Sequence, residues 1–240
     1  MRPALSKSIR AIGVLLFAAT AFLPVHSCGS GPSAYEPHKA AAPGKGRERP
    51  VDVQVPTREI AHDMEFGWRE GGALRALWHA RKWYPYLLVP FWAVALALFA
   101  WGGARARRAA GWGCLGLSVA IAAFEYAYIS SDYVGFLPRS WARFETVVAW
   151  LVVCTILVAR RGGRSVTDAE ACVSAQALLA VLHGGTFLVD DLRSWVGDGH
   201  GIGPIAHALF ANYHWAYWVA MGALLLAAAP AYTRRAAPTP

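Results

Sequence analysis

The chain has 240 residues, of which 56% are hydrophobic and 16% charged, and its formal net charge is +8 at pH 7. The basic residues lie in short clusters beside long apolar runs, not in a stripe with interleaved aromatic residues, and this argues against nucleic-acid binding. The four cysteines show no CxxC spacing, which argues against a disulfide scaffold and a structural zinc site. Segregated apolar runs instead indicate a membrane protein.

Residues 1–27 have the features of an export signal. Arg2, Lys7 and Arg10 form a positive start, and an apolar core follows over residues 11–23. That core is shorter than a membrane-spanning helix of about 20 residues. We therefore expect a signal peptide or an uncleaved signal anchor.

The exit of this segment, Val25-His26-Ser27-Cys28, resembles a bacterial lipobox. A branched residue lies three positions before the cysteine and a small residue directly before it. His26 departs from the pattern, because that position usually holds a small or apolar residue. Cys28 is a candidate for lipidation, and ordinary cleavage nearby or retention of the whole segment are the alternatives.

Two polar segments follow. Residues 28–56 are rich in Gly, Pro, Ala and charged residues and have no periodicity, so we expect a disordered exported tether. Residues 57–83 show a helical pattern with one apolar face, interrupted by Gly67, Gly71 and Gly72. This pattern predicts an amphipathic segment at the membrane interface, or a docking surface for a membrane-protein partner.

Five apolar runs occupy the rest of the chain. Each is long enough to cross a hydrocarbon core of about 30 Å as a helix, and a spanning segment must satisfy its own backbone hydrogen bonds. We predict an all-α fold with a bundle of five transmembrane helices over residues 84–232 and a tail over 233–240. The predicted spans are residues 84–102, 110–130, 141–159, 171–190 and 205–229.

The arginine clusters predict the orientation. They lie between the first and second spans, between the third and fourth, and after the fifth, whereas the alternate loops hold few basic residues. The clustered loops should face the cytoplasm. Residues 28–83 would then be extracytoplasmic and the C-terminus cytoplasmic, in a bacterial-type inner membrane.

The acidic and histidine residues of the predicted spans all fall in their outer halves at about 1.5 Å per residue. They are Glu125, Glu145, His183, Asp190, His207 and His214. Ionisable groups in a span are costly and usually face the bundle interior or a wet cavity. In one continuous helix His207 and His214, seven residues apart, would share a face.

Three hypotheses follow. In the first, the chain is an accessory or structural membrane component without a cofactor, and these groups pair with one another or with headgroups. In the second, His183 and His214 bind haem or a transition metal. In the third, Glu125 is the base of a metal-assisted hydrolase of a lipid or an exported substrate, with His183, His207 and His214 as metal ligands. The sequence has no GxSxG, HExxH or Walker motif, which favours the first.

Overall fold

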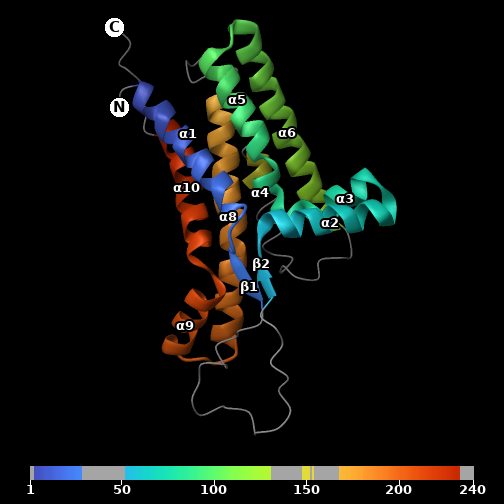
Figure 1. Cartoon of the computed structure of the whole chain (residues 1–240), viewed down its shortest axis with the longest axis vertical. Helices are drawn as coiled ribbons and strands as arrows, with labels where there is room; N and C mark the ends of the chain where they lie inside the picture. The colour runs from blue at the N-terminus through green and yellow to red at the C-terminus, as the bar shows by residue number, and fades with distance from the viewer. Residues whose placement is uncertain (1–2, 29–51, 131–147, 152, 154–167, 233–240) are drawn as a thin grey trace. The chain divides into compact units, whose positions relative to one another are not determined.

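The computed structural model describes residues 3–28, 52–130, 148–151, 153 and 168–232 (Figure 1). Within these residues the protein is helical apart from one two-stranded sheet, which confirms the all-α part of the predicted fold class. The chain divides into two compact units. The first unit contains Met1–Leu15, Leu88–Phe187 and Gly222–Pro240, and the second contains Leu16–Leu87 and Leu188–Met221.

Long apolar helices dominate the first unit. Helix α5 has a proline in its first turn, where the missing N–H costs nothing, and at its end the Gly102 N–H donates to the Leu98 carbonyl at 2.8 Å. Helix α6 follows after two glycines and lies beside α5. The helices that contribute to this unit are α1 (Pro3–Thr20), α5 (Val89–Trp101), α6 (Ala104–Ser130), α8 (Asp168–Gly197) and α10 (Trp215–Tyr232).

Helices α1 and α10 approach each other closely in the first unit. A Cβ atom placed on Gly13 would lie 2.7 Å from the Ala223 carbonyl oxygen and 2.7 Å from the Ala227 nitrogen. Only glycine fits at this point. Small residues at such a contact allow two backbones to meet, as in many membrane helix pairs.

The second unit combines a short sheet with short helices. Strands β1 (His26–Cys28) and β2 (Asp52–Gln54) are antiparallel, with His26 opposite Gln54. The predicted tether is therefore ordered at its end, because residues 52–54 form β2; its residues 29–51 lie outside the described residues. The helices found only in this unit are α2 (Pro56–Gly71), α3 (Ala73–Ala80), η2 (Arg81–Trp83), α4 (Tyr84–Leu87) and α9 (Ile202–Asn212).

Helices α2 and α3 form a helical hairpin, as Figure 1 shows. Gly72 has a φ of 76°, a left-handed conformation that favours glycine, and it separates the two helices. Gly67 is equally specific, because a Cβ atom there would lie 2.6 Å from the Cα of Ala76. The helical prediction for residues 57–83 is confirmed, and the glycines that interrupt its pattern make the fold-back possible.

The described residues hold one helix that is long and apolar enough to cross a membrane, Val173–Gly197 within α8. A single helix of this kind is weak evidence for a membrane protein. Shorter apolar helices cover Ser8–Thr20, Val89–Leu98 and Trp215–Ala228. Five transmembrane helices are therefore not confirmed, and most of the third predicted span lies outside the described residues.

The fifth predicted span is not one helix, and this corrects the sequence-based prediction. Helix α9 ends at Asn212, Tyr213 is extended at φ −98° and ψ 96°, and α10 begins at Trp215. The break has a partner: the His214 N–H donates to the Val25 carbonyl at 3.2 Å. The inference that His207 and His214 share one helical face is therefore wrong.

Candidate functional site

The break between α9 and α10 gathers polar side chains from three segments of the second unit. Strand β1 supplies His26 and Ser27, the break supplies Tyr213 and His214, and the end of α8 supplies Asp191. We call these five residues the break cluster. Four of its five members lie outside continuous helices, and only Asp191 belongs to one, so periodicity alone could not have grouped them.

The shortest contact of the break cluster joins a hydroxyl to an imidazole. Ser27 Oγ and His214 Nε2 are 2.6 Å apart, and which of them donates depends on the histidine tautomer. Ser27 is 2% exposed. A serine held against a histidine nitrogen has the geometry of a nucleophile and its base, and it is equally a buried hydrogen bond that fixes β1 to the break.

A carboxylate occupies the other side of the break cluster. The Tyr213 hydroxyl donates to Asp191 Oδ2 at 2.9 Å, and His26 Nε2 lies 3.8 Å from the same oxygen. The His26 ring meets the Tyr213 ring edge-on, with centroids 4.8 Å apart. Asp191 thus receives a charge-assisted hydrogen bond and has an imidazole within ion-pair distance.

An apolar core supports the break cluster. Val25, Trp83 and Ala216 are buried together, and four half-buried residues pack on them: Leu23, Ile60, Tyr86 and Tyr217. The backbone of Val25 joins two elements, because its N–H donates to the Gln54 carbonyl at 3.1 Å and its carbonyl accepts from His214. Strand β1 therefore holds both β2 and the α9–α10 break in place.

The predicted metal and haem ligands are distributed over both units. His183 lies in the first unit, where it is 7% exposed and meets the Phe187 ring edge-on at 5.4 Å. His207 and His214 lie in the second, His207 exposed on α9 and His214 in the break cluster. Across the part of the chain that the structure describes, no group of three or more His, Cys, Asp and Glu residues could hold a metal ion. Haem or metal binding stays a prediction.

Three further predicted residues are not tested. Glu125 lies in α6, but its side chain is outside the described part of the chain, and Glu145 is outside it altogether. Cys28 ends β1 with its Cα opposite that of Asp52, and its side chain is likewise not described. The proposed base and the proposed lipidation therefore stay predictions.

A second polar group, missed by the sequence analysis, lies in the core of the first unit. The Trp92 indole donates to Gln176 Oε1 at 2.8 Å. Gln176 Nε2 donates to Ser118 Oγ at 2.9 Å and to the Cys114 carbonyl at 3.1 Å. Trp92 and Gln176 are completely buried. This Gln176 network joins α5, α6 and α8, and it contains no charged or histidine side chain that would have drawn attention in the sequence.

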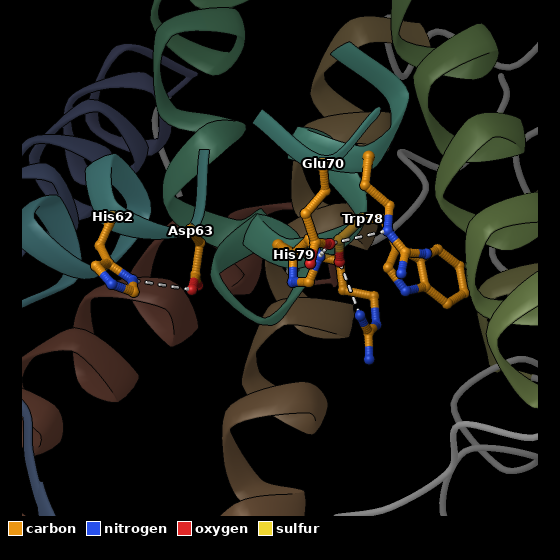
Figure 2. Close-up of polar contacts among 7 residues, drawn as sticks. His62, Asp63, Glu70, Trp78 and His79 are labelled. Atoms are coloured by element: carbon orange, nitrogen blue, oxygen red, sulfur yellow. Dashed lines mark hydrogen bonds and ion pairs between the residues drawn. The ribbon is translucent and has the colours of Figure 1, made fainter. Parts of the chain in front are cut away.

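The helical hairpin carries an exposed polar cluster, shown in Figure 2. Glu70 Oε2 accepts from His79 Nε2 at 2.9 Å and from Arg75 Nε at 3.4 Å. The hydrogen bond from His79 is the main cause that lowers the pKa of Glu70, and Arg75 adds to it. These three residues, the hairpin cluster, tie the end of α2 to α3 on the solvent side.

Comparison with known proteins gives no analogue for these sites. No family model matches the sequence, and searches of curated proteins and of solved structures found no match. The function must therefore be inferred from the geometry of the chain itself.

Proposed function

We propose that this chain is a multi-pass inner-membrane protein that serves as an accessory component of a membrane assembly, with residues 28–83 outside the cytoplasm. The observation that carries the proposal is the exposure of large apolar side chains on α5 and α10, two helices without a charged residue. A helix that is apolar all round is normally buried in protein or in a membrane, so lipid or another helix would cover these side chains. The exposed residues include Val94, Leu98, Trp101, Trp215, Trp218 and Leu225.

The five-span topology is part of this proposal. Its support is the alternation of arginine clusters along the sequence, together with the membrane-length helix Val173–Gly197. Single-cysteine variants test it in a background whose native cysteines are replaced by alanine. Cysteine at Asp198 should react with an impermeant thiol reagent in spheroplasts, and cysteine at Ser165 only after the membrane is opened. The reverse labelling, or release of the protein from membranes by alkaline carbonate, would contradict the proposal.

The accessory role is supported by how the polar groups are used. The Gln176 network joins three helices, and the break cluster joins β1, α8 and the α9–α10 break. Interhelical hydrogen bonds of this kind stabilise the packing of membrane proteins. A structural role, in holding helices and strands together, thus explains these polar side chains without a catalytic one.

We assign partner binding to the helical hairpin. The partner is a second membrane protein with a surface outside the cytoplasm. Phe66, Trp68, Leu74 and Leu77 are exposed on it, and charged residues such as Glu70 and Arg75 are interspersed. Exposed aromatic and apolar residues with a polar rim are typical of protein interfaces, and Trp is enriched among the residues that dominate the binding energy.

A photo-crosslinking amino acid at position 68 tests this assignment in native membranes. We expect an adduct to one defined membrane protein, and a much weaker adduct from the control position Ser194, which is exposed on α8 and not on the hairpin. Leu74→Asp should reduce the adduct from position 68. Adducts to lipid alone from position 68 would instead place the hairpin on the bilayer and contradict a protein partner.

The Ser27–His214 pair favours a second candidate, an ester or thioester hydrolase. Ser27 Oγ would attack the carbonyl carbon of the ester or thioester while His214 Nε2 takes the hydroxyl proton. His214 would then give this proton to the leaving group. In the second step His214 would take a proton from water, and the water oxygen would displace Ser27 Oγ from the acyl group. The burial of Ser27 counts against this candidate. Ser27→Ala should abolish labelling by a fluorophosphonate and His214→Gln should slow it by at least about 100-fold, while Ser194→Ala on the exposed part of α8 changes nothing.

A further inference from the structure

The segment that looks like an export signal is built into the fold in both units. In the first unit, Arg10 and Val14 are 2% and 3% exposed, and Gly13 touches the α10 backbone. A signal peptide that is removed leaves behind a domain that does not need it. Here its removal would uncover the small-residue face of α10 at Ala223 and Ala227, whose side chains are buried.

The second unit uses the rest of the same helix. Phe17 is 2% exposed and stacks on Tyr86 with ring centroids 4.5 Å apart. The Thr20 hydroxyl donates to the Phe17 carbonyl at 2.7 Å and lies 3.3 Å from the Tyr86 hydroxyl. The Thr57 N–H donates to the Ala21 carbonyl at 3.0 Å, so the first turn of α2 is attached directly to the end of α1.

Three of the four residues of the lipobox-like exit, His26-Ser27-Cys28, form strand β1. Cleavage before Cys28 would cut the bond after Ser27, whose Cα pairs with that of Val53 in β2 and whose side chain holds His214. A protease needs its substrate as an accessible extended segment, whereas Ser27 is buried within β1 and Val25 is buried directly before it, with its N–H bonded to the Gln54 carbonyl. His26, the residue that departs from the lipobox pattern, is the one whose ring packs on Tyr213.

We propose that residues 3–28 are retained in the mature protein, with α1 as a permanent helix of the fold and β1 as the strand that holds the α9–α10 break, and that Cys28 does not become a lipidated N-terminal residue. The departure of His26 from the lipobox then has a structural reason, since a small residue there would lose the contact with Tyr213. This inference does not depend on the hairpin partner, so either can fail alone.

Intact-mass measurement of the full chain purified in detergent from its native type of membrane tests the proposal. We expect a mass that includes residues 3–28 without added lipid, and Cys28→Ser should change it only by the substitution itself. A mature chain that begins at Cys28 with a diacylglycerol mass, or any chain cleaved between residues 21 and 28, would overturn the proposal.

A matched pair of glycine variants tests the structural role separately. Gly13→Leu should separate α1 from α10 and expose β1, so cleavage near Ser27 by an added protease should become at least tenfold faster. Gly116→Leu on α6 is the control, because a Cβ atom on Gly116 meets nothing within 4 Å. Equal protease resistance of the two variants would contradict the role assigned to α1. If Gly13→Leu yields no folded protein whereas Gly116→Leu folds normally, that difference supports the role.

Discussion

The two units place polar groups among apolar residues in different ways. In the first unit, the Gln176 network consists of neutral groups on three helices, and Trp92 and Gln176 are completely buried. In the second unit, the break cluster combines two histidines, a carboxylate, a phenol and a hydroxyl around a helix break and a strand. The side chains of His26 and Asp191 are 24% and 37% exposed, so the second group is reached by solvent.

This difference distinguishes polar groups that only stabilise the fold from polar groups that could also take part in a reaction. A buried amide that satisfies its neighbours can only hold helices together, and it should be expensive to remove because water cannot replace it. Polar groups at a partly exposed break can re-form hydrogen bonds with water, so each should matter less to stability. Variants of the two clusters should therefore differ in how much free energy of unfolding they lose.

The largest effect is expected for Gln176→Leu. It leaves the buried Trp92 N–H without its acceptor, at a cost of roughly 1–3 kcal/mol in the free energy of unfolding. Denaturant titration in detergent micelles, followed by helical circular dichroism, measures it. Ser174→Ala is the matched control on α8, because the Ser174 hydroxyl is buried without a hydrogen-bond partner among the described residues. The control should lose less than about 0.5 kcal/mol; equal losses would mean that packing, not the network, carries the stability.

Tyr213→Phe should follow at about 1–2 kcal/mol. A hydrogen bond to a charged group contributes roughly 1.5–3 kcal/mol, and the partial exposure of Asp191 reduces that figure. The ring packing against His26 is kept. In a double-mutant cycle with Asp191→Asn, Tyr213→Phe should lose most of its effect on the free energy of unfolding. If the effects of the two variants simply add, the Tyr213–Asp191 hydrogen bond does not contribute this free energy.

The sequence predicted the all-α class and the helical segment over residues 57–83, because apolar periodicity records which face of a helix is buried. It did not predict the break at Tyr213, since the run from Ile205 to Ala229 is mostly apolar and the partner that stops the helix, the Val25 carbonyl, is distant in sequence. Only the polar triplet Asn212-Tyr213-His214 within that run could have suggested it.

The candidate sites show the same limit. The depth of His214 in its predicted span indicated a functional residue that acts with His183 and His207. In the structure the His214 side chain contacts Ser27 instead. In the sequence Ser27 belongs only to the lipobox-like exit, with no signal that pairs it with His214. Gln176 is uncharged, so the cost of burying ionisable groups gives no reason to single it out. Pairing between distant segments depends on tertiary contacts that no local pattern encodes.

Ser27→Ala tests whether the break cluster is structural at its buried end. The loss should be about 1 kcal/mol, because the hydrogen bond to His214 disappears but the small side chain leaves little cavity. Hydrogen exchange gives the sharper readout: the amides of Val25 and His214, which form backbone hydrogen bonds at this point, should exchange several-fold faster. The amide of Ala76, in the hairpin, should be unchanged. Uniform acceleration across the chain would show that Ser27 affects global stability only.

The smallest effect should come from the hairpin cluster, which lies at the surface of the hairpin and is screened by salt. The pKa of Glu70 is lowered in the folded hairpin, chiefly by the hydrogen bond from His79. A group with a lowered folded-state pKa adds stability that is present above its ordinary pKa of 4.5 and is lost as the pH falls through the folded-state value.

Hydrogen exchange of the α3 amides should therefore accelerate, by less than about fivefold, when the pH is lowered through the folded-state pKa of Glu70. Glu70→Gln should remove this dependence, and His79→Gln should weaken it, because the two residues share one hydrogen bond. If both variants keep the wild-type acid response, the hairpin is held by the close contact at Gly67 and Ala76, and its polar cluster is free to serve the partner surface instead.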